Sequence, residues 1–237
     1  MGCTSSDAGT AGNPGTKANG DPYIVRYFPM YHGKIAGTKM MLDHAGANWE
    51  FEPINPPDWP AIKASGKTGE FKGFPFIKKG DRTIDLCVPA LRCVAVELGY
   101  YPASDWKKAA TADMIVETWN DLQSKWGPAL LSDKSDAEKA TAITDNFQEG
   151  TIGDKFFKQV ELAINKFGGK FITGNTLCHA DFCLASLFYD YFYNESSPFM
   201  SAMKPLLEEK HPAMVVYAKA LLAELGDLIT KRPNKPF

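Results

Sequence analysis

A short apolar hairpin leads directly into a helix start in residues 73–91, GFPFIKKGDRTIDLCVPAL. Free N–H groups at a helix N-terminus form a natural anion site, where polar side chains commonly orient the ligand. At this junction the side chains are those of Leu86 and Cys87. A thiol at a helix N-terminus can have a depressed pKa and form a mixed disulfide, although a free cysteine is often simply a small buried residue. The stretch predicts a backbone anion site with little help from side chains.

The cysteines and histidines do not gather into a metal or disulfide pattern. The five cysteines are odd in number, lie far apart and contain no CxxC pair, and the four histidines show no ligand spacing. We therefore expect no metal site and no disulfide framework. Unpaired cysteines also favour a reducing, cytoplasmic location.

Composition argues against two classes of partner. The 237 residues are 44% hydrophobic and 23% charged, which suits a protein with at least one sizeable core. The net charge is −2 and the basic residues are scattered, so we expect no nucleic-acid partner. No apolar run approaches the roughly 18 residues of a membrane-spanning helix.

Residues 1–21, MGCTSSDAGTAGNPGTKANGD, contain no aromatic residue and almost no apolar ones. Such a segment cannot bury enough surface to offset the entropy of ordering, so we expect a disordered tail. Its first six residues match the myristoylation pattern with Gly2 as the acceptor, and a palmitoyl group on Cys3 would supply a second anchor. The tail therefore predicts a peripheral membrane attachment, with a plain disordered start as the alternative.

The order of the next elements predicts an α/β domain over residues 22–101. A strand–helix–strand unit followed by a hairpin and a helix is the thioredoxin-like βαβ-ββα arrangement. Pro75, which opens the hairpin, is a candidate cis-proline. The expected elements are a strand at 22–28, a helix at 34–46, a strand at 48–54, hairpin strands at 75–77 and 82–86, and a helix at 89–99.

Residues 104–237 predict helices only, and thus an all-α domain. Ser135 and Glu138 form a capping box. Residues 174–194 are apolar nearly all round, which is typical of a helix at the centre of a bundle. Ser104 can cap a long helix whose apolar face would contain Ala110, Met114, Leu122 and Trp126.

This combination of domains resembles the cytosolic glutathione transferases. The motifs that carry the resemblance are PYIVRYFPMYHGK, ANWEFE, DWPAIK, the FP before the hairpin, and GNTLCHADF. The first two are similar to the pi and sigma classes in particular. The resemblance extends from Pro22 to the last helices, and it implies a glutathione-binding domain of the thioredoxin-like type followed by the helical domain.

The resemblance implies a role for three residues whose chemistry suits it. Tyr27 matches the catalytic tyrosine, whose hydroxyl donates a hydrogen bond to the glutathione sulfur and so favours the thiolate. Trp59 and Lys63 match the pair that holds the glycine carboxylate, and both carry the donors that a carboxylate requires. Taken alone, the three residues would be a buried strand aromatic, a structural tryptophan and a solvated lysine.

Further glutathione contacts follow from the same resemblance. Lys34 falls near the place of an arginine at the start of the first helix, one residue displaced. Phe74 precedes Pro75, and its backbone would pair with the cysteinyl part of glutathione. Asp121 matches an acidic residue that reaches the glutathione amine in the partner subunit, which implies a homodimer. The alternative for Asp121 is a solvated carboxylate.

The chain departs from the family pattern at the γ-glutamyl end of this site. Gly73 stands where the relatives have glutamine, and Leu86 and Cys87 stand where they have glutamine and serine. Each lost hydrogen bond to a charged group is worth about 1.5–3 kcal/mol. We therefore expect glutathione binding to be weakened by roughly one to three orders of magnitude without being abolished. Cys178 also replaces a serine or threonine helix cap, at a cost of about 0.5–2 kcal/mol.

Two functions compete at this point. The first is a glutathione transferase that conjugates the glutathione thiolate to small hydrophobic electrophiles, with glutathione as co-substrate, or an isomerase that uses the same thiolate. The second is a non-catalytic scaffold or interaction protein of the same fold, tethered to a membrane by its tail. Tyr27, Trp59, Lys63 and Asp121 favour the first, whereas Gly73, Leu86 and the tail favour the second.

Overall fold

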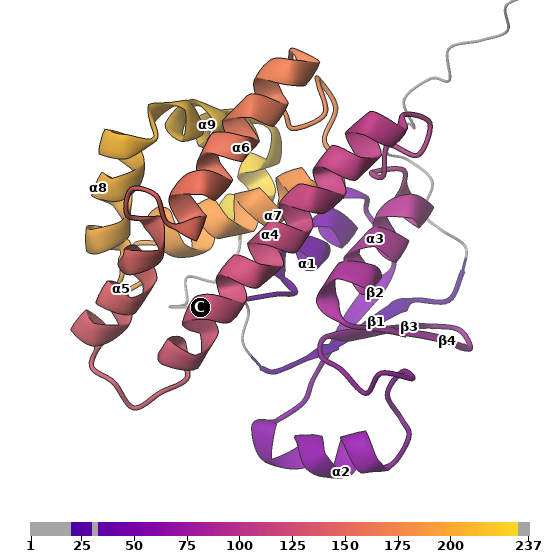
Figure 1. Cartoon of the computed structure of the whole chain (residues 1–237). Helices are drawn as coiled ribbons and strands as arrows, with labels where there is room; N and C mark the ends of the chain where they lie inside the picture. The colour runs from indigo at the N-terminus through magenta and orange to yellow at the C-terminus, as the bar shows by residue number, and fades with distance from the viewer. Residues whose placement is uncertain (1–19, 30–32, 232–237) are drawn as a thin grey trace, which may run out of the picture.

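The computed structural model describes residues 20–29 and 33–231 (Figure 1). The predicted lipidation sites, Gly2 and Cys3, lie outside the described residues. None of the helices in the described ranges is both long enough and apolar enough to cross a membrane.

The described residues of the first half form a four-stranded mixed sheet in the order β2-β1-β3-β4. β1 is parallel to β2 and antiparallel to β3, and β3 and β4 form the expected hairpin. In β1 the side chains of Tyr23, Val25 and Tyr27 are buried, and alternate residues are less so, because successive side chains of a strand point to opposite faces. The strands are β1 (Tyr23–Tyr27), β2 (Trp49–Pro53), β3 (Phe76–Lys79) and β4 (Arg82–Asp85).

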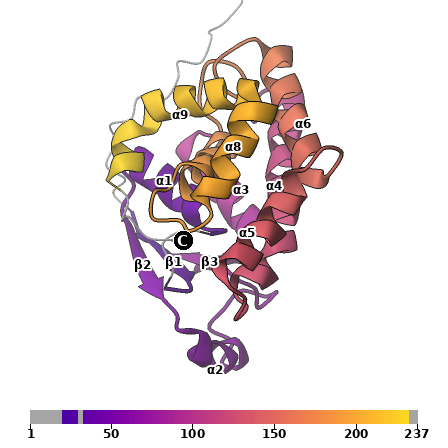
Figure 2. The same cartoon turned by 90° about the vertical axis from the view of Figure 1, so that its left-hand side faces the viewer.

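α1 and α3 lie on one side of this sheet (Figures 1 and 2). In both views α2 lies on the side away from α1 and α3 (Figures 1 and 2). The bounds are α1 (Ala36–His44), η1 (Pro56–Asp58), α2 (Trp59–Ala64) and α3 (Cys87–Leu98). α3 ends at Gly99, whose φ of 81° is left-handed and favours glycine. The Phe74–Pro75 peptide bond is cis, as predicted. The thioredoxin-like arrangement is therefore confirmed.

The second half is helical, as predicted, and α4 and α6 run side by side along its outer edge (Figure 2). The capping box of Ser135 and Glu138 is present at the start of α5. The elements are α4 (Trp106–Leu130), α5 (Asp136–Thr144), η2 (Asp145–Phe147), α6 (Ile152–Phe167), α7 (His179–Leu187), the π-helical turn η3 (Phe188–Phe192), α8 (Met200–Lys210) and α9 (Pro212–Thr230).

Two expectations for α4 are wrong. The helix is capped by Asp105 rather than Ser104, because the Asp105 carboxylate accepts hydrogen bonds from the N–H groups of Lys107 and Lys108 at 3.0 and 3.3 Å. Ala110 and Met114 face solvent, whereas Leu122 and Trp126 are buried as expected. One turn of a helix takes about 3.6 residues, so residues spaced by multiples of four drift around a long helix and do not stay on one face.

α7 lies at the centre of the bundle, and all nine of its residues are buried. The missing serine or threonine cap is compensated by Asp181, whose carboxylate accepts from the N–H groups of Cys178 at 2.8 Å and Ile172 at 3.1 Å. The Tyr217 hydroxyl, from α9, donates to the same carboxylate. The helix start is therefore held by a capping box of Cys178 and Asp181, which Tyr217 joins from α9.

Candidate functional site

Tyr27 is the last residue of β1, and its side chain is 9% exposed. Burial raises the pKa of Tyr27 to about 12, the thiol of Cys87 adds to this, and a hydrogen bond from the backbone N–H of Lys34 opposes it. The phenol is therefore protonated at neutral pH. Because the Lys34 N–H occupies an oxygen lone pair, the phenol proton is left to donate to a ligand.

An aromatic cluster surrounds Tyr27. The Phe28 and Phe74 rings have centroids 5.6 and 5.9 Å from the Tyr27 ring, and they lie 4.8 Å from each other. Trp59, at the start of α2, packs on Phe74 with a centroid distance of 3.7 Å. The loop that precedes β3 therefore joins Trp59 to Tyr27 through Phe74, and three of the predicted site residues lie in one cluster.

The start of α3 carries Leu86 and Cys87 next to this cluster. Leu86 is the N-cap residue, with φ 71° and no side-chain hydrogen bond to the helix. Burial raises the pKa of the Cys87 thiol, although the nearby Lys34 ammonium and the backbone N–H groups of Val88 and Cys87 lower it. Desolvation therefore outweighs the helix end, and of the two interpretations of Cys87 the small buried residue is the one that agrees with the structure.

Lys34 and Cys87 meet at a residue of α4. The Asn120 side-chain oxygen accepts a hydrogen bond from the Lys34 ammonium at 3.0 Å and one from the Cys87 thiol at 3.0 Å. The Ser124 hydroxyl accepts a second hydrogen bond from Lys34 at 2.9 Å. The Lys34 side chain thus ties the first domain to α4.

Gly73 lies against Leu86. A Cβ built on Gly73 would overlap the Leu86 Cδ2 and lie 3.3 Å from its Cγ. The Gly73 N–H donates to the Asp85 carboxylate at 3.2 Å, which holds the loop against the end of β4. Two of the positions that depart from the family pattern, Gly73 and Leu86, therefore lie against each other.

The structure does not bring every predicted residue together. Lys63 in α2 and Asp121 in α4 are both exposed. Neither makes any of the hydrogen bonds or ion pairs found among the described residues. A contact of either residue with glutathione or with a partner subunit stays a prediction.

Sequence reasoning missed Asn120, Ser124 and Asp85. Asn120 precedes Asp121, and residues that are neighbours in a helix differ by about 100° in direction. Only one of the two can face the first domain. The spacing of four residues between Asn120 and Ser124 could have indicated them, because it places both side chains on the same face of the helix.

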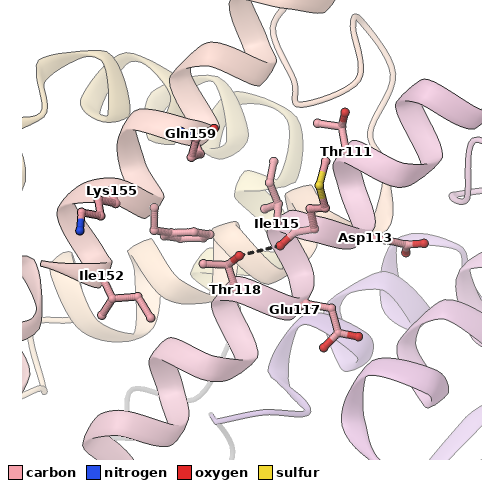
Figure 3. A pocket seen from close by; sticks show the side chains of 10 residues that line it. Thr111, Asp113, Ile115, Glu117, Thr118, Ile152, Lys155 and Gln159 are labelled. Carbon is pink, nitrogen blue, oxygen red and sulfur yellow. Dashed lines mark hydrogen bonds between the residues drawn. The ribbon is translucent and has the colours of Figure 1, made fainter.

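A groove of about 750 Å³ lies away from this cluster, between α4 and α6 (Figure 3). The Thr118 hydroxyl in its floor donates to the Met114 carbonyl at 2.8 Å, so it is satisfied within the helix. Among the described residues no three His, Cys, Asp or Glu side chains lie close enough together to hold a metal ion. The groove is lined by Met114, Ile115 and Thr118 of α4 and Ile152, Lys155 and Phe156 of α6, among others.

Comparisons with known proteins agree with this architecture. The family model "Glutathione S-transferase, C-terminal domain" matches residues 120–224. "Glutathione S-transferase P 1" of Xenopus laevis is 26% identical over 215 residues, which cover 90% of this chain and 97% of the relative. "Glutathione S-transferase P" of Bos taurus is 29% identical over 168 residues, covering 70% of this chain and 75% of the relative.

Solved structures show the same fold. The glutathione S-transferase from Ascaris lumbricoides superimposes on this chain with a TM-score of 0.70 at 18% sequence identity. The superposition covers 91% of this chain and 100% of the Ascaris protein. The family model, the curated relatives and the solved structure therefore agree that this chain is similar to the glutathione S-transferases, through residues 120–224 by the family model and over most of its length by fold.

Proposed function

We propose that the protein is a glutathione-dependent transferase in which Tyr27 stabilises the thiolate of bound glutathione. The observation that carries this proposal is the protonated phenol of Tyr27, whose oxygen already accepts from the Lys34 N–H and whose proton is free to donate. A hydrogen bond to the sulfur favours the thiolate over the thiol. The thiol proton leaves to solvent, and the thiolate then attacks a small hydrophobic electrophile and displaces its leaving group.

The ring cluster supports a bound peptide on one side of the tyrosine. The rings of Trp59 and Phe74 are in contact, so the indole of Trp59 is held against the Phe74 side chain. In this proposal the Phe74 backbone pairs with the cysteinyl part of glutathione, while the indole N–H and Lys63 hold the glycine carboxylate. The exposed position of Lys63 suits a donor that meets its ligand from solvent.

The test compares the wild type with Tyr27→Phe, which removes only the hydroxyl. A hydrogen bond to a charged sulfur is worth about 1.5–3 kcal/mol, so turnover of a generic aryl halide should fall about tenfold to a hundredfold. Glutathione affinity, measured by calorimetry, should change little. Turnover that is equal in the two proteins would contradict the role of Tyr27, and no binding at millimolar glutathione would contradict the transferase itself.

We also propose that the protein is a homodimer whose second copy covers the groove between α4 and α6. Met114, Thr118 and Asp121 are spaced by four and three residues, so they lie along one face of α4. Met114 and Thr118 line the groove, and Met114 is 62% exposed. A copy seated there would bring Asp121 to the interface, where it can approach the partner's ligand.

The contact between Gly73 and Leu86 favours a second candidate function, a non-catalytic member of the fold. Neither residue carries a polar side chain, whereas the relatives have glutamine at both positions. In that case the chain would act as a scaffold, held at a membrane by lipids on Gly2 and Cys3. Mass spectrometry of natively expressed protein tests the lipids, and an unmodified N-terminus would contradict them. The calorimetry above separates the two functions.

A further inference from the structure

The start of α4 and the end of α6 lie together at one end of the molecule (Figure 1). The Lys108 ammonium, from α4, lies 5.8 Å from the centroid of the Phe167 ring, and the Lys166 ammonium lies 5.0 Å from the same centroid. Lys108 also reaches the loop after α6, where its ammonium would be 3.6 Å from a Cβ built on Gly174. Lysines that are far apart in the sequence are therefore neighbours in the structure.

This end of the molecule is basic, although the whole chain carries a net charge of −2. Asp105 is the one acidic residue in the sequence segments 99–110 and 162–178. Its carboxylate already accepts hydrogen bonds from two N–H groups in the first turn of α4, at 3.0 and 3.3 Å. Positive charge therefore dominates here. It comes from Lys107, Lys166 and Lys170, which are exposed, and from Lys108, which is half-buried.

Helix stability does not account for the lysines at the start of α4. A helix N-terminus carries a partial positive charge, so cations in the first turn are unfavourable. The first turn of α4 contains no acidic residue and has Lys107 and Lys108 instead. The first residue of the helix, Trp106, is 73% exposed. An exposed indole beside two lysines suits a partner outside the chain.

The backbone around these lysines is held in shape. The Phe171 N–H donates to the Gly174 carbonyl at 2.9 Å, and the Gly174 N–H donates back to the Phe171 carbonyl at 3.2 Å. Lys170 therefore directly precedes a tight turn. The His179 N–H donates to the Tyr100 carbonyl at 3.1 Å, which ties the end of this loop to the segment that leads into α4.

We propose that Trp106, Lys107, Lys108, Lys166 and Lys170 form a basic face that binds the surface of an anionic lipid bilayer. Lysines close to an anionic leaflet are attracted to its headgroups. Tryptophan favours the boundary between headgroups and acyl chains, because its ring is apolar and its N–H is polar. A bilayer surface matches both the lysines and the exposed indole, whereas an acidic polypeptide matches the lysines alone.

The basic face gives the predicted lipid anchor a second signal. One myristoyl chain binds membranes only marginally, and stable attachment takes a second acyl chain or a basic patch. The chain between Gly2 and Gly20 can extend over roughly 60 Å. An acyl group on Gly2 can therefore enter the same bilayer that the basic face contacts. This inference does not use the site at Tyr27, so it stands or fails separately from the proposed transferase.

The first test uses the full chain with Gly2→Ala, so that no myristoyl group contributes. Co-sedimentation measures binding to vesicles of mixed phosphatidylcholine and phosphatidylserine, and to vesicles of phosphatidylcholine alone. We expect binding to the anionic vesicles at low salt, little binding to the neutral ones, and loss of binding at about 1 M salt, where charges are screened within about 3 Å. Equal binding to both vesicles, or none to the anionic ones, would overturn this inference and leave the proposed transferase standing.

Charge reversal locates the surface that binds. With Lys107→Glu and Lys166→Glu together, the partition coefficient should fall at least about thirtyfold, the contribution of two lysines at an anionic surface. Lys125→Glu with Lys134→Glu is the matched control, because it makes the same charge change at exposed lysines near the other end of α4. Circular dichroism checks that each variant is folded. An equal loss in the two pairs would overturn the assignment, since net charge would then govern binding.

Trp106→Ala tests the aromatic part of the basic face. Binding to the anionic vesicles should fall severalfold, because apolar area is no longer buried at the interface. Leu131→Ala is the matched control, since Leu131 is 72% exposed and lies at the other end of α4. Unchanged binding of Trp106→Ala would remove this residue from the basic face.

An acidic protein is the competing partner, and soluble polyglutamate represents it. We expect the unacylated chain to bind the anionic vesicles more tightly than polyglutamate, and Trp106→Ala to weaken only the binding to vesicles. Tighter binding to polyglutamate, with no effect of Trp106→Ala on either ligand, would overturn the assignment to lipid in favour of an acidic polypeptide.

Discussion

Gly37 lies directly against the backbone of Cys183, where an added Cβ would be 3.0 Å from the Cys183 nitrogen and 3.1 Å from its Cα. Gly37 belongs to α1 in the thioredoxin-like domain, and Cys183 belongs to α7 at the centre of the helical domain. α1 and α7 therefore approach each other closely at Gly37, the residue of α1 that has no side chain. This close approach positions α1 relative to α7.

Gly37→Val should destabilise the protein because the new side chain has only backbone to displace. We expect a loss of about 1–3 kcal/mol in the free energy of unfolding, the usual cost of overpacking, measured by urea denaturation. Gly127→Val in α4 is the matched control, since an added Cβ there meets nothing within 4 Å. A stable Gly37→Val with unchanged midpoint would contradict the close approach.

The free energy of unfolding should decrease in acid because of Asp113. Partial burial raises its pKa, but hydrogen bonds with His179, Arg92 and Tyr101 outweigh burial and hold the pKa at about 2. An aspartate in an unfolded chain has a pKa of about 3.9. The contribution of Asp113 is therefore present above about pH 4 and is lost as the pH falls toward about 2.

Asp113→Asn should consequently cost stability at neutral pH and little at about pH 2, where the wild-type carboxyl is protonated as well. The loss at neutral pH should be about 1–3 kcal/mol, the cost of leaving buried hydrogen-bonding groups unpaired. Urea denaturation at the two pH values measures the difference. Asp133→Asn is the control, because Asp133 is exposed and makes none of the hydrogen bonds found in the described ranges. A difference that is constant with pH would contradict the prediction.

The Cys87 thiol should react slowly in the folded protein. Its pKa is raised by burial, so less thiolate is present at neutral pH, and the thiol is hydrogen-bonded to Asn120. We expect labelling by a maleimide at least about tenfold slower than that of a cysteine in a denatured control, with the rate rising as the pH is raised. Peptide mapping by mass spectrometry assigns the site. Labelling of Cys87 at the rate of the denatured control would contradict this prediction.

The groove between α4 and α6 should control the oligomeric state if a second copy covers it. Met114→Glu places a charge on an exposed apolar position of the groove, and we expect a shift from dimer to monomer in sedimentation velocity. Val216→Glu, at an exposed position of α9, is the control and should leave the dimer intact. A wild type that sediments as a monomer would remove the homodimer proposal.

Local patterns in the sequence were sufficient for the order of the elements. Strand and helix periodicity predicted the mixed sheet and the helical half, and Gly99 marks the end of α3 because its left-handed backbone suits glycine. The position of Pro75 predicted the cis bond. These features depend on residues close together in the chain, so their physical causes are visible in the sequence.

Contacts between distant segments were decided only by the tertiary structure. The sequence named Asp121, but the direction of α4 turns Asn120 toward Lys34 and Cys87. It left open whether the Cys87 thiol is reactive or simply buried, and burial of Cys87 raises its pKa. The sequence also showed Gly73 and Leu86 as two separate losses. The tertiary structure brings the Leu86 side chain against Gly73, a contact that no local pattern in the sequence shows.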